Sequence, residues 1–403
     1  MRVFYIHQYF KTPEEGGAIR SWYLSTALAE RGISVDVITT HNKKEYQKKQ
    51  LDGVVVHYLP VRYDNTFGFM RRIMAFMIFV IKAVKLMKKL KKPDLCYATS
   101  TPLTVGLAAR WLKRYRNVPY YFEVRDLWPE APIEMGYFRD PLSRAFVRYL
   151  EKLVYRSADK IVCLSPGIKE YVAKLMPDKP LYLIPNMSDT DFFVPSQYKM
   201  PEANNTLTIS YIGAVGPVNH LEYLLDIAAA SMEAHIPVLF NVAGEGSKLE
   251  YLKQIAKDKC LDNVSFVGRL DRGGVREMLE NSDVVYISFK NIPVLETNSP
   301  NKYFEALAAG KMCVVNSKGW IADMLEHHRA GFYSAPSNPY DFVRKIEPFI
   351  RDATLLRSYQ ENARLLATEQ FSRKQLSEAF YHIITGEQRP SKINKELAYI
   401  LNP

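Results

Sequence analysis

The chain has 403 residues, more than one ordinary domain holds, so two domains are expected. A composition of 47% hydrophobic and 24% charged residues excludes a disordered chain. The net charge is +13 over residues 1–200 and −2 over residues 201–403, so the first half is expected to meet an anionic partner. The N-terminus reads directly as a strand, with no secretory signal expected, and the four scattered cysteines lack a metal-binding spacing.

Strands and helices alternate through the first half, as in a parallel α/β sheet. Strands are predicted at residues 3–7, 33–39, 54–60, 95–99, 119–124, 160–164 and 181–184, and helices near 18–31, 67–92, 103–116, 142–157 and 165–176. Gly16 and Gly17 mark the first strand-to-helix turn, and Arg20 follows in the first turn of the helix. Glycine turns of this kind often bind phosphate, although a tight turn and a surface arginine explain the pattern equally well.

The predicted helix at residues 67–92 is apolar in its middle and basic at both ends. Its uninterrupted apolar core, residues 73–81, is far shorter than the roughly 20 residues that span a bilayer. The basic residues that we assign to a membrane-facing role are Arg71, Arg72, Lys82, Lys85, Lys88 and Lys89. A cationic amphipathic helix predicts docking on an anionic membrane surface; the alternative is a core-packed helix with a solvated basic end.

Arg125 and Asp126 directly follow the predicted strand at residues 119–124. Open α/β sheets place their ligands at the carboxyl ends of parallel strands. Arg125 could therefore contact a phosphate and Asp126 a sugar hydroxyl, or the two could form a structural ion pair.

The second half repeats the alternation after a polar, proline-containing linker at residues 187–206. The domains predicted are 1–190, 207–370 and a C-terminal helix with tail, 371–403. Strands are expected at 207–212, 238–243, 264–267, 284–288 and 312–316, and helices at 221–233, 248–258, 274–281, 321–326, 340–351 and 353–369. Gly213, Gly216 and Gly244 mark strand-to-helix turns. The sequence thus predicts an α/β protein of two doubly wound, nucleotide-binding-like domains that face a cleft.

The stretch Ser299–Lys311 reads as a short helix with Ser299 as its N-cap, Pro300 in its first turn and Gly310 at its end. Free amides at the helix start and the ammonium of Lys302 suit a phosphate. The carboxylate of Glu305, one turn later, could accept hydrogen bonds from sugar hydroxyls. Together they suggest a nucleotide-sugar site; the alternative is a capped surface helix between two strands.

Several short motifs occur in the order and spacing of a known family. They are residues 8–10 with Gly16, Gly17 and Arg20; residues 123–130; Pro185-Asn186; residues 244–246; residues 267–268; and residues 299–311. On these motifs the chain resembles the retaining glycosyltransferases of family 4, whose GT-B fold has two facing Rossmann-like domains. The segments at 125–130 and 299–302 resemble the branch that builds bacterial O-antigen, capsule and colanic-acid polysaccharides, which includes enzymes similar to L-fucosamine transferases.

The resemblance implies transfer of a sugar, such as an N-acetylamino sugar, from a UDP-linked donor with retention and without a metal or other cofactor. It implies a polyprenyl-diphosphate-linked saccharide as acceptor, and hence a cytoplasmic enzyme peripheral to the inner face of the plasma membrane. Asp126 and Arg125 are the catalytic candidates. The donor site is expected to comprise Gly17, Arg20, Gly213, Gly216, Gly244, Arg269, Ser299, Asn301, Lys302 and Glu305.

Two departures from the family pattern leave alternatives open. Thr297 stands where the family has a first glutamate, with Glu296 one residue out of register, and the loop after Gly213 lacks the usual Arg and Lys. The two alternatives are a GT-B-fold epimerase of UDP-N-acetyl sugars and a non-catalytic partner that binds nucleotide-sugar or membrane. A nucleic-acid-binding protein is disfavoured, because the positive charge gathers on an apolar helix.

Overall fold

The computed structural model describes residues 1–17, 19–64, 67–195 and 206–387, and these form two compact units. Unit 1 comprises Met1–Pro185, Thr297–Ser299 and the chain from Leu376, and unit 2 comprises Asn186–Glu296 and Pro300–Gln375. The first unit therefore ends five residues before the predicted boundary at residue 190. Of the predicted linker, residues 187–195 belong to unit 2, and residues 196–205 lie outside the described part of the chain, as do residues 388–403 of the tail.

Unit 1 is built on an eight-stranded sheet that is parallel except at one edge. In sheet order the strands are β3 (Gln47–Leu51), β4 (Val54–Pro60), β2 (Ser34–His41), β1 (Arg2–Ile6), β5 (Leu95–Thr99), β6 (Tyr120–Val124), β7 (Lys160–Cys163) and β8 (Leu181–Leu183). The antiparallel edge strand β3 was not predicted, because its polar sequence lacks the apolar pattern of a buried strand. Exposed lysines on a short edge strand discourage pairing with another chain.

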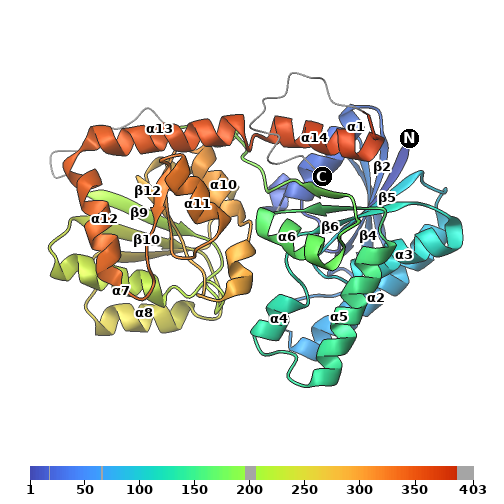
Figure 1. Cartoon of the computed structure of the whole chain (residues 1–403), viewed down its shortest axis with the longest axis horizontal. Coiled ribbons are helices and arrows are strands. Elements are labelled where there is room, and N and C mark those ends of the chain that lie inside the picture. Colours follow the sequence, from blue (N-terminus) through green and yellow to red (C-terminus); the bar gives the residue numbers. More distant parts are fainter. Residues whose placement is uncertain (18, 65–66, 196–205, 388–403) are drawn as a thin grey trace. The chain divides into compact units, whose positions relative to one another are not determined.

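Helices cover both faces of this sheet. They are α1 (Arg20–Glu30), α2 (Phe69–Lys89), α3 (Val105–Arg116), α4 (Glu130–Glu134), α5 (Pro141–Ser157), α6 (Pro166–Leu175) and α14 (Arg373–Thr385). Figure 1 shows α1 and α14 on one side of the sheet and α2, α3 and α5 on the other. The ring of Phe380 in α14 lies 4.8 Å from that of Tyr97 and 6.5 Å from that of Tyr5. The C-terminal helix thus packs on unit 1, a long-range contact that local sequence signals do not reveal.

Unit 2 contains a six-stranded parallel sheet in the order β11-β10-β9-β12-β13-β14. The strands are β9 (Leu207–Ile212), β10 (Val238–Ala243), β11 (Val264–Gly268), β12 (Val284–Ile287), β13 (Met312–Val315) and β14 (Gly331–Tyr333). The helices are α7 (Glu222–Glu233), α8 (Leu249–Asp258), α9 (Arg272–Glu280), α10 (Asn301–Ala308), α11 (Trp320–His327), α12 (Pro339–Arg351) and α13 (Ala353–Glu369). Two doubly wound α/β domains are confirmed; the three-residue strand β14 was not predicted.

The long helix α2 has the predicted position, with a buried side formed by Ala75, Phe79, Val80, Ala83 and Met87. No helix in the described part of the chain has both the length and the apolar composition needed to cross a membrane.

Candidate functional site in unit 2

The helix α10 begins one residue later than the sequence predicted. Pro300, with φ −76° and ψ 137°, is the N-cap residue, and no side chain caps the helix, so the assignment of Ser299 as N-cap is wrong. Pro300 itself has extended backbone, so the first helical residue is Asn301. At the other end, Gly310 has φ +64°, and the amides of Gly310 and Lys311 donate to the carbonyls of Leu307 and Ala306. This Schellman-type end confirms the predicted stop.

Lys302 places its ammonium in the interior of unit 2. The Nζ atom is buried and has no hydrogen-bond partner among the described residues. It lies 4.0 Å from the ring centroid of Tyr211 and 5.6 Å from that of Phe289. Burial lowers the pKa of this ammonium to about 7, although the nearby carboxyl of Glu305 acts to raise it. A buried cation that has no hydrogen-bond partner among the described residues, and is supported only by two aromatic rings and the charge of Glu305, is incompletely compensated, so the site favours an added anion.

Hydrogen bonds to neighbouring backbone fix the two rings beside Lys302. The hydroxyl of Tyr211 donates to the carbonyl of Ala214 at 2.6 Å. The amide of Asn316 donates to the Phe289 carbonyl at 3.0 Å, and its Oδ1 accepts from the Phe289 backbone N–H at 2.8 Å. Neither Phe289 nor Asn316 was identified from the sequence, because each follows a buried strand without a motif of its own.

Glycines form the adjacent edge of the sheet, at the carboxyl ends of β9, β10 and β11. Gly213 N–H donates to Ala243 O at 2.9 Å, and Gly244 N–H donates to Gly268 O at 2.7 Å. A Cβ atom added to Gly213 would lie 3.1 Å from Lys302 Nζ. The predicted glycine turn and the predicted lysine are therefore brought together, and together they can receive a phosphate.

Replacing Gly244 with alanine is expected to destabilise unit 2 by about 3 kcal/mol, through backbone strain and overpacking. Gly244 has φ +147°, and an added Cβ would lie only 1.8 Å from the carbonyl oxygen of Gly213. The measurement is chemical denaturation of the purified variant. Gly216→Ala is the matched control, since an added Cβ there meets nothing within 4 Å, and equal losses in both variants would contradict the explanation.

Glu305 lies one helical turn after Lys302 and is half-buried in an ionic environment. Burial raises the pKa of its carboxyl to about 7; the charges of Arg272 and Lys302 act to lower it, and Asp189 acts to raise it. Arg272, at the start of α9, forms an ion pair with Asp189, which also lies 3.6 Å from Arg373. Sequence reasoning missed Arg272, whose only local signal is the preceding N-cap residue, Asp271.

The remaining donor candidates in unit 2 lie nearer the surface. Asn301 occupies the first position of α10 and is half-buried. Arg269 follows β11, and its side chain is 73% exposed, with the carboxylate of Glu245 at 3.9 Å. Gly216 is the first residue of a turn closed by a hydrogen bond from Asn219 N–H at 3.1 Å. These three residues stay predictions as ligand contacts.

Candidate residues in unit 1

Arg125 and Asp126 lie at the carboxyl end of β6 and do not pair with each other among the described residues. The Arg125 guanidinium donates to His7 Nε2 at 3.4 Å, and Asp126 accepts from the Thr101 hydroxyl at 2.8 Å. His7 is buried, and its Nδ1 has no partner among the described residues. Burial, followed by the charge of Arg125, holds the pKa of His7 well below its usual range, so this imidazole is neutral.

Arg20 was predicted to contact donor phosphate, but the structure buries it with Glu123. Its Nε and Nη2 both donate to Glu123 Oε1, at 2.9 and 2.7 Å, and its side chain is 1% exposed. Further donations reach Pro185 O at 2.5 Å and Ile184 O at 2.9 Å. A guanidinium that donates to all these acceptors joins α1 to the ends of β6 and β8, so Arg20 has a structural role and is not a donor-binding residue. The expectation of a surface arginine is also wrong.

Gly17 and Thr297 complete the predicted positions in this unit. Gly17 has φ +84°, is exposed and has open space where a Cβ would lie, which fits the predicted turn. Thr297, which replaces the expected glutamate, is grouped with unit 1, and its carbonyl accepts a hydrogen bond from Ser165 Oγ at 2.5 Å. Within the described ranges, no group of three or more His, Cys, Asp and Glu side chains is arranged to hold a metal ion.

Unit 2 is an α/β domain with a candidate anion site at the carboxyl edge of its parallel sheet. Comparison with models of known protein families identifies the family to which the chain belongs. Residues 15–187 match the model described as a glycosyl transferase 4-like domain, and residues 197–366 match the model of glycosyl transferases group 1. Together the two models span most of the chain, which belongs to the glycosyltransferases of GT-B fold.

Curated relatives are distant in sequence. An uncharacterised glycosyltransferase of Methanocaldococcus jannaschii is 22% identical over 246 residues, which are 59% of this chain but only 61% of that protein. The lipopolysaccharide core biosynthesis glycosyltransferase LpsE of Rhizobium meliloti is 22% identical over 94% of this chain and 98% of its own length.

Solved structures share the fold across nearly the whole chain. Sucrose-phosphate synthase of Thermosynechococcus elongatus has a TM-score of 0.75 and 16% identity, over 96% of this chain and 98% of its own. Anabaena HepE, solved with UDP and glucose, has a TM-score of 0.69 and 17% identity, over 96% of this chain and all of its own. Both likenesses support the GT-B fold, and identity this low carries the fold alone.

Proposed function

We propose that the protein is a retaining hexosyltransferase that moves a sugar, such as an N-acetylamino sugar, from a UDP-linked donor to a lipid-linked saccharide. The observation that carries the proposal is the buried ammonium of Lys302, which lacks a hydrogen-bond partner among the described residues beside the glycine edge of unit 2. A donor diphosphate would supply the missing anion. HepE, solved with UDP and glucose, lends support to a UDP-linked donor.

Such a site lowers the barrier to transfer by stabilising the leaving group. As the bond between sugar and diphosphate breaks, negative charge grows on the β-phosphate. A cation and backbone amides that are already in place stabilise this charge without reorganising at the transition state. Glu305 would accept hydrogen bonds from ribose hydroxyls, in keeping with the family resemblance. The mechanism that we propose needs no metal.

Unit 1 is proposed to handle the acceptor. Asp126 is exposed at the sheet edge, where its carboxylate can orient a hydroxyl of the acceptor or of the transferred sugar. Arg125 can contact a phosphate, and its guanidinium is positioned by the hydrogen bond that it donates to the neutral imidazole of His7. Attack by the acceptor hydroxyl on the face that the leaving group occupied would retain the stereochemistry, with the leaving phosphate helping to take the proton.

The acceptor is proposed to be a polyprenyl-diphosphate-linked saccharide of a surface polysaccharide such as O-antigen or capsule, reached at the inner face of the plasma membrane. An exposed apolar row on α2 supports this proposal; its members are Met70, Met74, Met77, Ile78 and Ile81. A second exposed row on α5 consists of Leu142, Phe146 and Tyr149. Apolar rows beside cationic side chains suit a bilayer interface.

The six cations predicted to face the membrane differ in their surroundings. Lys85, Lys88 and Lys89 are exposed on the last turns of α2. Lys82 instead donates to Pro60 O at 2.6 Å, and Arg72 donates to Phe67 O at 2.8 Å. Arg71 is exposed, with its guanidinium 3.8 Å from the ring centroid of Phe67.

Replacing Lys85, Lys88 and Lys89 with glutamine should weaken binding to anionic vesicles by about 100-fold, since each basic residue near the surface contributes about 1 kcal/mol. Vesicle flotation at two salt concentrations measures the effect. The control replaces Lys253, Lys257 and Lys259 of unit 2 with glutamine, which removes the same charge from another surface. Equal losses in both variants would refute a specific membrane surface on α2.

Thermal-shift screening against a panel of nucleotide-sugars, followed by a donor-hydrolysis assay of each hit, tests the enzymatic proposal. Stabilisation by UDP-sugars with slow hydrolysis of the sugar–phosphate bond is the expected result. Interconversion of free UDP-N-acetyl sugars would favour the epimerase instead. Binding without turnover, even with lipid-linked acceptors, would favour the non-catalytic partner.

A further inference from the structure

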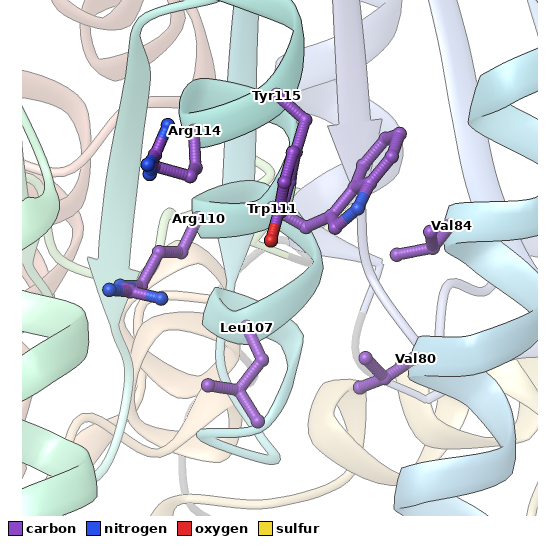
Figure 2. Close-up of a pocket in the computed structure, with 7 residues that line it drawn as sticks. All are labelled: Val80, Val84, Leu107, Arg110, Trp111, Arg114 and Tyr115. Atoms are coloured by element: carbon purple, nitrogen blue, oxygen red, sulfur yellow. The ribbon is translucent and has the colours of Figure 1, made fainter.

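A groove of about 410 Å³ lies between α2 and α3 of unit 1, apart from the residues assigned to donor or acceptor. Its lining comprises Val80, Val84, Leu107, Arg110, Trp111, Arg114 and Tyr115. Figure 2 shows the indole of Trp111 directed toward Val84 of α2, whereas both guanidiniums end on the side away from α2. The groove is therefore amphipathic, with apolar and cationic walls on opposite sides.

Its charge is positive and uncompensated. No acidic side chain lines the groove, and within the described residues neither Arg110 nor Arg114 has a hydrogen bond or an ion pair. Lys88 adds a third cation, with Nζ 5.5 Å from the ring centroid of Trp111. Two neighbouring guanidiniums with free donors are suited to bind a phosphate group.

Its apolar wall lies where the buried side of α2 meets the exposed row. Val80 is on the buried side, and Val84 is half-buried one helical turn after Ile81, which is 52% exposed. Trp111 and Tyr115, whose ring centroids are 5.7 Å apart, lie between this wall and solvent, and such amphipathic rings favour the boundary between lipid and water. A ligand that matches both walls combines an anionic head with an apolar chain.

We propose that this groove binds one anionic phospholipid of the bilayer. Its headgroup phosphate contacts Arg110 and Arg114, and the start of an acyl chain lies over Trp111, Val80 and Val84. The inference rests on the proposed membrane contact, in which basic side chains attract anionic lipid without selecting one molecule. It adds a site that binds a single lipid specifically. The enzyme would thereby take a defined orientation on anionic membrane.

The test measures binding of dihexanoyl phosphatidylglycerol, a short-chain lipid used below its micelle concentration, to the full-length protein by Trp fluorescence. Arg110→Gln with Arg114→Gln should weaken this binding about 30-fold, and Trp111→Phe should remove the fluorescence change. Dihexanoyl phosphatidylcholine and glycerol phosphate should both bind far more weakly than the anionic lipid. Arg344→Gln with Arg357→Gln in unit 2 is the charge-matched control and should bind normally.

The outcomes separate this site from the membrane proposal. Loss of short-chain lipid binding in the double variant, with the far-UV circular dichroism spectrum retained, would support the groove. This holds even if replacing Lys85, Lys88 and Lys89 left vesicle binding unchanged. Anionic vesicle binding that depends on Lys85, Lys88 and Lys89, but with no binding of the short-chain lipid, would overturn the groove and leave the membrane surface standing. Binding of farnesyl diphosphate in place of the phospholipid would overturn it in favour of the acceptor chain.

Discussion

Replacing Lys302 with methionine is expected to lower kcat by about 10²–10³-fold, the loss typical when one preorganised charge-stabilising group is removed. Methionine keeps the stem of the side chain and removes the ammonium, which is the buried cation beside Gly213. In the absence of donor the same variant should melt at a higher temperature than the wild type. An ammonium without a hydrogen-bonding partner costs free energy when buried, and the apolar side chain does not carry that cost.

Steady-state kinetics and thermal melts of one protein preparation measure both effects. Lys257→Met, which removes an exposed cation from α8, is the matched control and should change neither quantity. If Lys302→Met lowered both kcat and the melting temperature, the role assigned to Lys302 would be contradicted. That result would mean that the ammonium stabilises the fold and does not serve as an anion-binding group.

The pH dependence of donor affinity follows from the same burial. Burial lowers the pKa of Lys302 to about 7 and raises that of Glu305 to about 7. As pH rises through 7 the lysine loses its positive charge and the glutamate gains a negative one, and both changes weaken binding of a diphosphate. Affinity for a nucleotide-sugar should therefore fall between pH 6 and pH 9. In Lys302→Arg, whose guanidinium stays charged, the fall should be shallower.

How far the sequence predicts the site depends on whether the signal is local. The sequence correctly placed Lys302 and Glu305 on one short helix, because a proline, a glycine and helical spacing all lie within twelve residues; their role as donor contacts stays a prediction. The predicted N-cap was wrong by one residue, because Pro300 has extended backbone and precedes the helix. The glycine turns at Gly213 and Gly244 were likewise local, and only the structure shows that they touch.

Residues whose partners lie far along the chain were missed or misassigned. Arg20 precedes Glu123 by 103 positions, so spacing alone offered no reason to pair them. Phe289 and Asn316 act on Lys302 through packing that no motif encodes. The return of α14 to unit 1 depends on Phe380 meeting Tyr97, a contact between opposite ends of the sequence.

Arg20→Met should lower the free energy of unfolding by about 3–5 kcal/mol, because it leaves the carboxylate of Glu123 buried without its cation. Glu123→Leu should cost a similar amount by stranding the guanidinium. The double variant should cost much less than the sum of the two, since both charges then leave the interior together. Arg357→Met, which breaks an exposed pair with Glu361, is the control and should cost about 0.5 kcal/mol at most.

The pH dependence of this loss distinguishes a structural Arg20 from a donor-binding one. Burial alone would raise the pKa of Glu123, but the charges of Arg20 and Arg125 and a hydrogen bond from Thr99 outweigh it and hold that pKa below its usual range. The pair therefore stabilises the protein fully above the ordinary pKa of a glutamate, and this contribution is lost as pH falls through the lower value of the folded state. Denaturation of wild type and Arg20→Met from pH 7 to pH 3 should show a difference that narrows in acid. If Arg20→Met instead kept wild-type stability at every pH and lost donor binding, Arg20 would belong to the donor site, as its place after the glycine turn first indicated.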